Sequence, residues 1–364
     1  MNFIRKCIAL ILLILSIISS IGLLLASYIQ YFSPIHFSPP ALLGLAFPIF
    51  VVTTIILLLL LLPIYARYAL VPFVSLLLAI PAFLQYSPIN IRHDNIDTNR
   101  ERFTLLSYNV YYFVDSKNEP GFDQAQHNRT LQYIIDTNAD VVALQEGHGY
   151  WGAVKGQKRT QEQVDKIAQL YPYHICQNRS RIFSKFPIRL ISDTIYTPSA
   201  NTSIYQLDIN GRTVTLFNNH LESIGLTRDD KQLYSDIITS PDSIGEKLGG
   251  IKVFAKKFMN AFQLRALQSQ YVDSMARTMG GNIIMCGDIN DTPNSYAYHT
   301  LQKGRRDAFC ELGLGPGFTY RADRMWVRID HIIYQGSFTA RDIEKGQYLY
   351  SDHYPLLVTF EWND

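Results

Sequence analysis

The sequence predicts an α/β domain preceded by a group of membrane-spanning helices. Residues 1–86 contain no Asp or Glu, and their only fixed positive charges are Arg5, Lys6 and Arg67. From Phe103 onward, short apolar runs of strand length alternate with amphipathic segments, a pattern typical of α/β domains. The 364 residues are long enough to hold both parts.

Three apolar runs predict the membrane helices, at residues 7–29, 41–62 and 69–86. A helix needs about 20 apolar residues to cross the hydrocarbon core. A cleaved signal peptide is the rival interpretation of the first run, but the length of that run and the two runs after it favour an anchor. The third run is the shortest and contains Pro72 and Pro81, which membrane helices tolerate. We therefore assign residues 1–88 to a membrane anchor.

The positive charges predict how the anchor is oriented. Arg5 and Lys6 favour a cytoplasmic N-terminus, and Arg67 suits the same side. Three spans then place the rest of the chain outside the cytoplasm. Three arginines after the third span weigh against this orientation, although acidic residues are mixed among them. The sequence thus predicts a multi-pass integral membrane protein with an extracytoplasmic domain.

The charge outside the anchor is close to neutral. Removing the three membrane-region cations from 33 Lys and Arg leaves 30, against 31 Asp and Glu. Proteins that bind nucleic acid usually carry a basic footprint, so nucleic acid is not favoured as a partner, although a local basic patch can hide in a neutral sum. The four cysteines show no paired spacing, which argues against a zinc site or a disulfide framework.

Residues 89–102 are polar and predict a linker, and residues 103–364 form the predicted soluble domain. Apolar periodicity within this domain predicts helices at 127–137 and 263–277. The predicted strands are 103–110, 140–146, 213–219, 282–286, 328–334 and 356–362.

Polar motifs end most of these strands or follow them directly. Each motif alone has a structural explanation, since a Gly-Asp pair is usually a turn and a single His is usually packed or exposed. A set of them at the edges of apolar strands is typical of an active site. The motifs are Ser107-Tyr-Asn109, Leu144-Gln-Glu146, Asn219-His220, Gly287-Asp288-Ile-Asn290, Arg328-Ile-Asp330-His331 and Ser351-Asp352-His353.

These residue types suit the cleavage of a phosphate ester. Mg²⁺ prefers oxygen ligands and usually takes one or two carboxylates, a role that fits Glu146 and Asp352. An attacking water needs a group that orients it and accepts its proton, which Asp288 with Asn290, or alternatively His353, can supply.

The remaining polar residues can stabilise the charge that develops on the phosphate oxygens. Hydrogen-bond donors aimed at those oxygens are required, and His220, Asn109 and His353 can donate. A carboxylate beside a histidine fixes its tautomer, which makes Asp330 a plausible partner for His353.

In this order, the motifs resemble the endonuclease/exonuclease/phosphatase superfamily. Its members include pancreatic-type deoxyribonucleases, apurinic-site endonucleases, neutral sphingomyelinases and inositol polyphosphate 5-phosphatases. The resemblance covers about Phe103 to Trp362. It implies a four-layered α/β sandwich, with two mixed sheets and helices outside. It also implies a Mg²⁺-dependent phosphoesterase, with Mn²⁺ as a possible substitute.

The resemblance also implies a role for each site residue. Glu146 would be the principal metal ligand, with Asp352 completing the metal environment and Asn109 beside the metal-bound phosphate. His220 and Asn290 would contact the substrate phosphate. The residues with implied catalytic roles are His220, Asp288, Asn290, Asp330 and His353.

The sequence departs from the family pattern in places. Tyr111 stands where many nuclease members carry an acidic residue, so a second metal contact there is doubtful. His148 has no assigned role. The stretch 224–262 interleaves lysines with large apolar residues, which suits either an interfacial helix or a helix packed on its own sheet.

We therefore expect a membrane-anchored, metal-dependent hydrolase of phosphate esters whose partners are the bilayer and its substrate. Tethering and the neutral charge favour a phosphodiesterase acting on a lipid headgroup or a small phosphodiester. The alternative is an extracytoplasmic nuclease acting on DNA or RNA, which the breadth of the family supports. A non-enzymatic tethered binding module would predict the loss of some site residues, and the main ones are all present.

Overall fold

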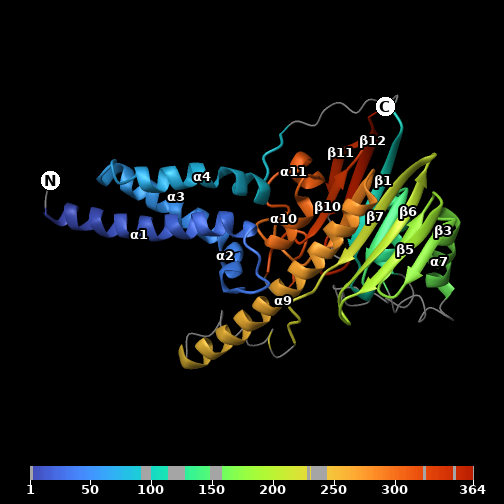
Figure 1. Cartoon of the computed structure of the whole chain (residues 1–364), viewed down its shortest axis with the longest axis horizontal. Coiled ribbons are helices and arrows are strands. Elements are labelled where there is room, and N and C mark those ends of the chain that lie inside the picture. The colour runs from blue at the N-terminus through green and yellow to red at the C-terminus, as the bar shows by residue number, and fades with distance from the viewer. Residues whose placement is uncertain are drawn as a thin grey trace. The chain divides into compact units, whose positions relative to one another are not determined.

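The structure is a computed structural model that describes residues 3–91, 100–113, 128–147, 158–227, 230, 244–322, 325–346 and 350–363. The chain forms two compact units (Figure 1). The first comprises Met1–Ser87, Ile224–Leu267 and Thr292–Thr300. The second comprises Pro88–Ser223, Gln268–Asp291 and Leu301–Asp364.

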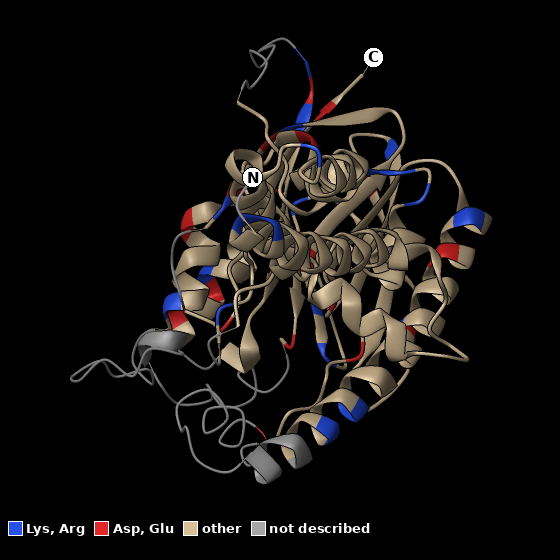
Figure 2. Ribbon diagram, turned by 90° about the vertical axis from the view of Figure 1, so that its left-hand side faces the viewer, with Lys and Arg blue, Asp and Glu red and all other residues tan. Residues whose placement is uncertain are grey.

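The N-terminal part of the first unit is helical. Its longer helices are α1 (Phe3–Tyr28), α3 (Phe47–Ile64) and α4 (Leu70–Tyr86). Its short ones are η1 (Ile29–Tyr31), η2 (Pro39–Ala41) and α2 (Leu42–Leu45). By length and composition, the α1–η1 segment and α3 could cross a membrane, whereas α4 has only 17 residues. In Figure 2 these helices are tan almost throughout, because the segment has so few charged residues.

Small polar side chains join the apolar helices to one another. Ser19 on α1 hydrogen-bonds to Thr54 on α3 at 2.8 Å, and Ser75 on α4 donates to Ser20 at 3.0 Å. At Gly22 an added Cβ would lie 2.2 Å from the Phe50 ring, so this position has room only for glycine. Small and hydroxylated residues at helix contacts are typical of membrane helix bundles.

The second apolar run does not form one helix from its start. The run was predicted to begin at residue 41, but α3 begins at Phe47, and η2 and α2 occupy residues 39–45. Pro48 lies in the first turn of α3, where proline is tolerated because the first amides of a helix lack partners. Pro39 and Pro40 likewise shape the preceding 3₁₀ turn.

The second unit contains two six-stranded mixed sheets. The first has the order β11-β12-β1-β2-β4-β3, and the second has the order β5-β6-β7-β8-β10-β9. The strands β1 and β2 are parallel, as are β7 and β8, and the other neighbours are antiparallel. The first sheet comprises β1 (Arg102–Asn109), β2 (Val141–Gln145), β3 (Tyr173–Gln177), β4 (Ser180–Ser184), β11 (Phe338–Lys345) and β12 (Leu356–Trp362). The second comprises β5 (Ile188–Ile195), β6 (Asn201–Ile209), β7 (Arg212–His220), β8 (Ile283–Asp288), β9 (Arg306–Asp307) and β10 (Asp330–Gln335).

Apolar side chains from both sheets meet in one core, which includes Phe103, Tyr205, Ile284 and Trp362. A second cluster joins the first sheet to the helices α5 (Arg129–Thr137) and α7 (Lys158–Leu170). Further helices in the described residues are α9 (Ile244–Met279), α10 (Tyr296–Gln302) and α11 (Ala308–Leu312), and η3 (Tyr111–Phe113) follows β1. The predicted sandwich of two mixed sheets flanked by helices is confirmed (Figure 1).

The six predicted strands correspond to β1, β2, β7, β8, β10 and β12. The predicted helix at 127–137 is α5, which begins at Arg129 because the Asn128 side chain caps it by accepting from Leu131 N at 2.9 Å. The helix predicted at 263–277 is the last part of the 36-residue α9. Much of the predicted linker, residues 92–99, lies outside the described residues, but Asn90 already donates to the carbonyl of Gly313 at 3.0 Å.

The lysine-rich first half of α9 has two kinds of face. Phe254 and Phe262 are buried, as expected for a packed helix. Ile251 and Val253 are exposed, with Ile251 exposing 51% of its surface. Neither interpretation of this segment therefore covers the whole helix.

Candidate active site

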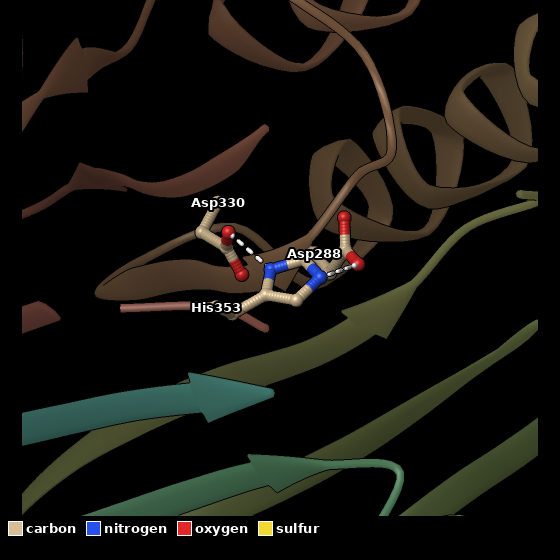
Figure 3. Close-up of side chains that lie close together, drawn as sticks. All are labelled: Asp288, Asp330 and His353. Carbon is tan, nitrogen blue, oxygen red and sulfur yellow. Dashed lines mark hydrogen bonds and ion pairs between the residues drawn. The ribbon is translucent and has the colours of Figure 1, made fainter. Parts of the chain in front are cut away.

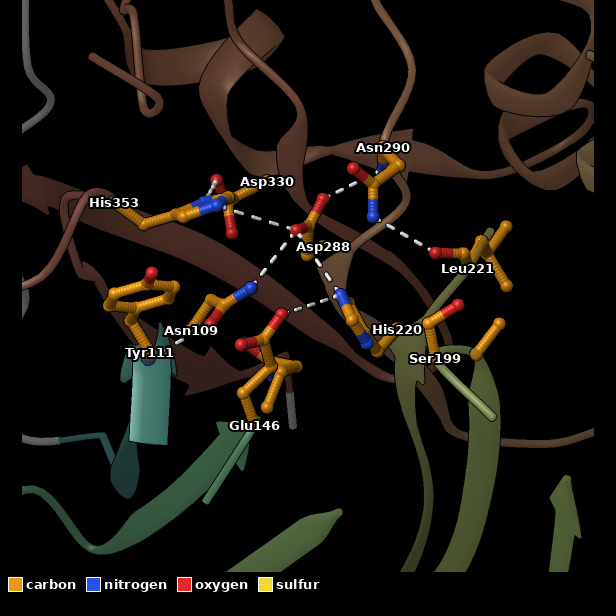
Figure 4. Close-up of polar contacts among 12 residues, drawn as sticks. Asn109, Tyr111, Glu146, Ser199, His220, Leu221, Asp288, Asn290, Asp330 and His353 are labelled. Carbon is orange, nitrogen blue, oxygen red and sulfur yellow. Dashed lines mark hydrogen bonds and ion pairs between the residues drawn. The ribbon is translucent and has the colours of Figure 1, made fainter. Parts of the chain in front are cut away.

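The paired strand ends gather most of the predicted site residues (Figure 4). Asn109 ends β1 and pairs in register with Gln145 at the end of β2. His220 ends β7 and pairs with Asp288 at the end of β8, and Asp330 begins β10 opposite Asp288. Because the carboxyl ends of parallel strands share one sheet edge, the two sheets bring these side chains to one place.

His353 lies between two buried carboxylates (Figure 3). Its Nδ1 is 2.7 Å from Asp330 Oδ2, and its Nε2 is 3.5 Å from Asp288 Oδ2. The ring also packs edge-on against Tyr320, with 5.0 Å between centroids. Burial alone would lower the pKa of His353, but Asp330 and Asp288 raise that pKa well above its usual value. The ring is therefore fixed in orientation and favoured in its protonated form.

Asp288 is held by donors on both of its oxygens. The backbone N of Asn290 donates to Oδ1 at 2.7 Å, and Asn109 Nδ2 donates to Oδ2 at 3.1 Å. Burial raises the pKa of Asp288 to about 7, against the opposing effect of the His353 charge. A carboxylate with such a pKa can accept a proton effectively near neutral pH.

His220 faces the carboxylates from the second sheet. Its Nε2 lies 3.3 Å from Glu146 Oε1 and 3.7 Å from Asp288 Oδ2. Burial, and then the charge of His353, lower the pKa of His220 to about 3. The ring is therefore neutral at ordinary pH and can donate one hydrogen bond from Nε2 if that nitrogen carries the proton.

Glu146 follows β2 in a left-handed conformation, with φ of 54°. Burial raises its pKa, and the negative charge of Asp352 raises it further. Two carboxylates that repel each other in a largely buried place form a donor set that a hard divalent cation would neutralise. Glu146 and Asp352 lie close enough for their charges to interact, and Asn109 hydrogen-bonds to Glu146, but the metal site expected at these three residues stays a prediction.

A second group could also hold a metal. Single ligand atoms of Asp288, Asp330 and His353 lie within 4.8 Å of one another. In this group, however, Asp330 lies within hydrogen-bond distance of His353, and the raised pKa of the ring favours its protonated form. Only a neutral imidazole binds metal, so a cation held by this group would have to displace the proton of His353.

With this geometry in view, comparisons with known proteins place the chain. A family model described as "Endonuclease/Exonuclease/phosphatase family" matches residues 106–353. The chain belongs to this family. Members of the endonuclease/exonuclease/phosphatase family are generally phosphoesterase hydrolases that use divalent metals. A second model, "Domain of unknown function (DUF8431)", matches residues 9–86.

No curated protein matches the chain. Among solved structures, D. rerio TDP2 complexed with single strand DNA product is similar at 19% identity and a TM-score of 0.47, with 71% of this chain and 99% of that chain covered. Truncated Caenorhabditis elegans TDP2 is similar at 17% identity and 0.43, covering 71% and 98%. The endonuclease/exonuclease/phosphatase from Beutenbergia cavernae is similar at 15% identity and 0.43, covering 72% of each chain.

In this member of the endonuclease/exonuclease/phosphatase family, neighbouring residues brace the site. Ser351 Oγ donates to the carbonyl of Asn109 at 2.8 Å, which ties the loop carrying His353 to the end of β1. Asn290 adopts a φ of 55° and donates from Nδ2 to the carbonyl of Leu221 at 2.9 Å. This contact uses one of the two hydrogens on the Asn290 amide nitrogen to bind the residue that follows β7.

The position that departs from the nuclease pattern has a defined structure. Tyr111 N donates to Asn109 Oδ1 at 3.2 Å, and Tyr111, Tyr112 and Phe113 all have positive φ. His148, which the sequence left without a role, lies outside the described residues.

The sequence did not single out one cation of the site. Arg179 Nη1 donates to the hydroxyl of Tyr112 at 2.7 Å, near Glu146. None of the motifs or strands predicted from the sequence includes residue 179. The Asn178-Arg179 turn between β3 and β4 was the available signal, since Asn commonly occupies turns and has a φ of 46° here.

Proposed function

We propose that this family member is a membrane-anchored, metal-dependent phosphodiesterase that acts on a lipid headgroup or another small phosphodiester near the bilayer. The observation that carries the proposal is the buried series of contacts from Asp330 through His353 to Asp288, beside the His220–Glu146 contact. This arrangement supplies a proton acceptor, a protonated donor and a neutral donor around one position.

Asp288 is our candidate for the group that accepts the proton of the attacking water. Hydrogen bonds from Asn290 and Asn109 fix the direction of its carboxylate. As the water oxygen bonds to phosphorus, its proton moves to Asp288, and the bond from phosphorus to the leaving oxygen breaks. The raised pKa of Asp288 makes it a stronger base than an ordinary aspartate.

The two histidines would stabilise the charge on the phosphate oxygens. Protonated His353 can donate from Nε2, with Asp330 holding its other nitrogen. His220 can donate from Nε2 without carrying a charge, because burial keeps it neutral. In this scheme Asp330 is a positioning residue, while His220, Asn109 and Asn290 lie at the substrate phosphate.

Glu146 and Asp352, with Asn109, would hold the divalent cation, for which we propose Mg²⁺, with Mn²⁺ as a possible substitute. When bound, such a cation polarises the phosphate and neutralises its charge. The mutual repulsion of the two carboxylates supports this assignment.

The anchor supports a substrate at the membrane. Arg5 on α1 donates to the carbonyl of Pro63 at 2.8 Å, which places the N-terminal charges beside the end of α3 that leads to Arg67. Positive charges gathered at one end favour the cytoplasmic side for that end. With α4 as a third span, the residues after Ser87 would lie outside the cytoplasm.

A direct test uses the full chain in lipid nanodiscs. We expect EDTA-sensitive hydrolysis of sphingomyelin or another phospholipid, abolished in His353→Ala and retained in His174→Ala, whose histidine is exposed on β3. Cleavage of plasmid DNA in place of lipid would transfer the proposal to the nuclease alternative. If the folded protein cleaves neither phospholipid nor plasmid DNA, then EDTA and His353→Ala change nothing. The enzymatic proposal then fails in favour of a binding module.

A further inference from the structure

Arg179 is joined through its backbone to the segment that carries Glu146. It lies in the turn between β3 and β4, and its carbonyl accepts from the backbone N of Gly147 at 2.8 Å. Its side chain is half-buried, and Nη1 donates to the Tyr112 hydroxyl at 2.7 Å. The guanidinium carbon also lies 5.8 Å from the centre of the Tyr112 ring.

Tyr112 joins the same segment from its other side. Its backbone N donates to the carbonyl of Glu146 at 3.0 Å. It adopts a φ of 55°, between Tyr111 at 41° and Phe113 at 59°. Consecutive left-handed residues with side chains cost about 1 to 2 kcal/mol each and persist only where surrounding contacts fix them. Glu146 and Gly147 are thus hydrogen-bonded to Tyr112 on one side and to Arg179 on the other.

The Arg179 guanidinium lacks an anionic partner in the described part of the chain. No carboxylate there lies within 4.0 Å of it, and its hydrogen-bonding partner is a neutral phenol. The guanidinium is nevertheless joined to the site through Tyr112, because Tyr112 accepts from Arg179 Nη1 and donates from its backbone N to the carbonyl of Glu146.

We propose that Arg179, held in position by Tyr112, binds a phosphate oxygen of the substrate next to Glu146. The inference rests on the proposed function and adds a substrate-binding residue to it. A guanidinium presents five N–H donors in a plane that matches phosphate oxygens. Of these donors, one on Nη1 hydrogen-bonds to Tyr112. A phosphate would supply the direct anionic contact that no described carboxylate makes with the guanidinium.

The main rival is a structural role, in which Arg179 only holds Tyr112 and the turn in place. The two roles differ in what they predict for ligand binding. A phosphate-binding residue should change affinity for phosphate without changing the folding of the protein. A structural residue should lower stability, and removal of the Tyr112 hydroxyl should reproduce that loss.

The test compares four variants of the full chain in detergent: Arg179→Met, Arg179→Lys, Tyr112→Phe and Arg189→Met. Arg189 is an exposed arginine on β5 and serves as the matched control. Inorganic phosphate binding is measured by isothermal titration calorimetry, and bis(4-nitrophenyl) phosphate hydrolysis gives kcat and KM. Melting temperatures identify variants that fail to fold.

We expect Arg179→Met to weaken phosphate binding by about 10- to 100-fold and to raise KM more than it lowers kcat, because the contact is made in both ground and transition states. Arg179→Lys should recover part of the affinity, and Tyr112→Phe should lose less than Arg179→Met. Arg189→Met should match the wild type.

Two results would overturn the inference. One is a folded Arg179→Met variant that binds phosphate as the wild type does. The other is an equal loss in Arg179→Met and Tyr112→Phe together with lowered melting temperatures. If the wild type hydrolyses no phosphodiester but binds phosphate in an Arg179-dependent way, the proposed function fails while this inference stands.

Discussion

Replacing Asp330 with Asn tests whether the orientation of His353 matters for catalysis. Asn has the shape of Asp but lacks the charge that lies 2.7 Å from His353 Nδ1. Both residues are buried, at 3% and 4% exposure, so little solvent screening weakens their interaction. Removing one partner of a buried ion pair costs about 3 to 5 kcal/mol. If that cost falls on the transition state, kcat drops by about 10²- to 10⁴-fold, at 1.36 kcal/mol per factor of ten.

The chain contains a matched control for this variant. His331 Nδ1 lies 3.5 Å from Asp307 Oδ2, and this second Asp–His pair is as buried as the first. Asp307→Asn should therefore lower stability while the folded protein keeps its kcat. The assay is steady-state hydrolysis of bis(4-nitrophenyl) phosphate, normalised to folded protein. A folded Asp330→Asn variant with kcat within about threefold of the wild type would refute the positioning role of Asp330.

Three further predictions concern the metal, the backbone and pH. Glu146→Gln should raise the metal concentration for half-maximal activity by at least about 10-fold, whereas Glu222→Gln should not, and an unchanged metal titration would remove Glu146 from the metal site. Gly287→Ala should cost more stability than Gly304→Ala in thermal unfolding. Both glycines have positive φ, but only at Gly287 would an added Cβ lie 2.1 Å from a backbone carbonyl oxygen of β7, so equal losses would contradict this prediction. Burial would raise the pKa of Asp307, but the His331 side chain and the charge of Arg328 lower it to about 2 from the usual 3.8. Ionised Asp307 therefore contributes about 2 kcal/mol to the free energy of unfolding, which is present above pH 4 and lost as pH falls towards 2. The stability difference between the wild type and Asp307→Asn should accordingly shrink over that range in acid unfolding measurements, and a constant difference would show that the charge of Asp307 contributes nothing.

The positions of the strand-end residues were predictable because local patterns determine them. Asn109, His220 and Asp288 each end an apolar run, and the pattern of such a run predicts a strand without knowledge of the strands that pair with it. The family resemblance supplied the arrangement of the strands in two sheets. Periodicity alone could not, because β1 pairs with β12 across more than 250 residues. Sequence patterns of short range do not carry such pairings.

The parts that the sequence missed depend on backbone conformation and on contacts between segments. Glu146 and Asn290 have positive φ although neither is a glycine, and no propensity rule assigns that conformation to them. Arg179 reaches Tyr112 from a different strand pair, and its turn contains no motif that marks function. The start of α3 at Phe47 shows the same limit, since apolar composition alone does not separate α2 from α3.

The electrostatics of the site explain why one set of residues would need both a metal and the arginine that Tyr112 holds. A phosphate ester is anionic, and the site contains the four carboxylates Glu146, Asp288, Asp330 and Asp352. The raised pKa of His353 keeps its ring protonated, so that its positive charge offsets the negative charge of Asp330. The raised pKa of Asp288 leaves that carboxyl partly protonated near neutral pH. Glu146 and Asp352 repel each other, and the charges of His353 and Arg179 offset that repulsion only in part, since the pKa of Glu146 stays raised.

An anionic substrate would therefore meet its strongest repulsion beside Glu146 and Asp352. A divalent cation between Glu146 and Asp352 would reverse the sign of the field there. Arg179 adds a permanent positive charge on the same side, anchored to Gly147 and Tyr112. Loss of Arg179 should therefore matter most at low metal concentration, where the carboxylates are least neutralised. The ratio of wild-type to Arg179→Met activity should then fall as metal is added. A ratio that does not change with metal concentration would show that Arg179 and the cation act independently.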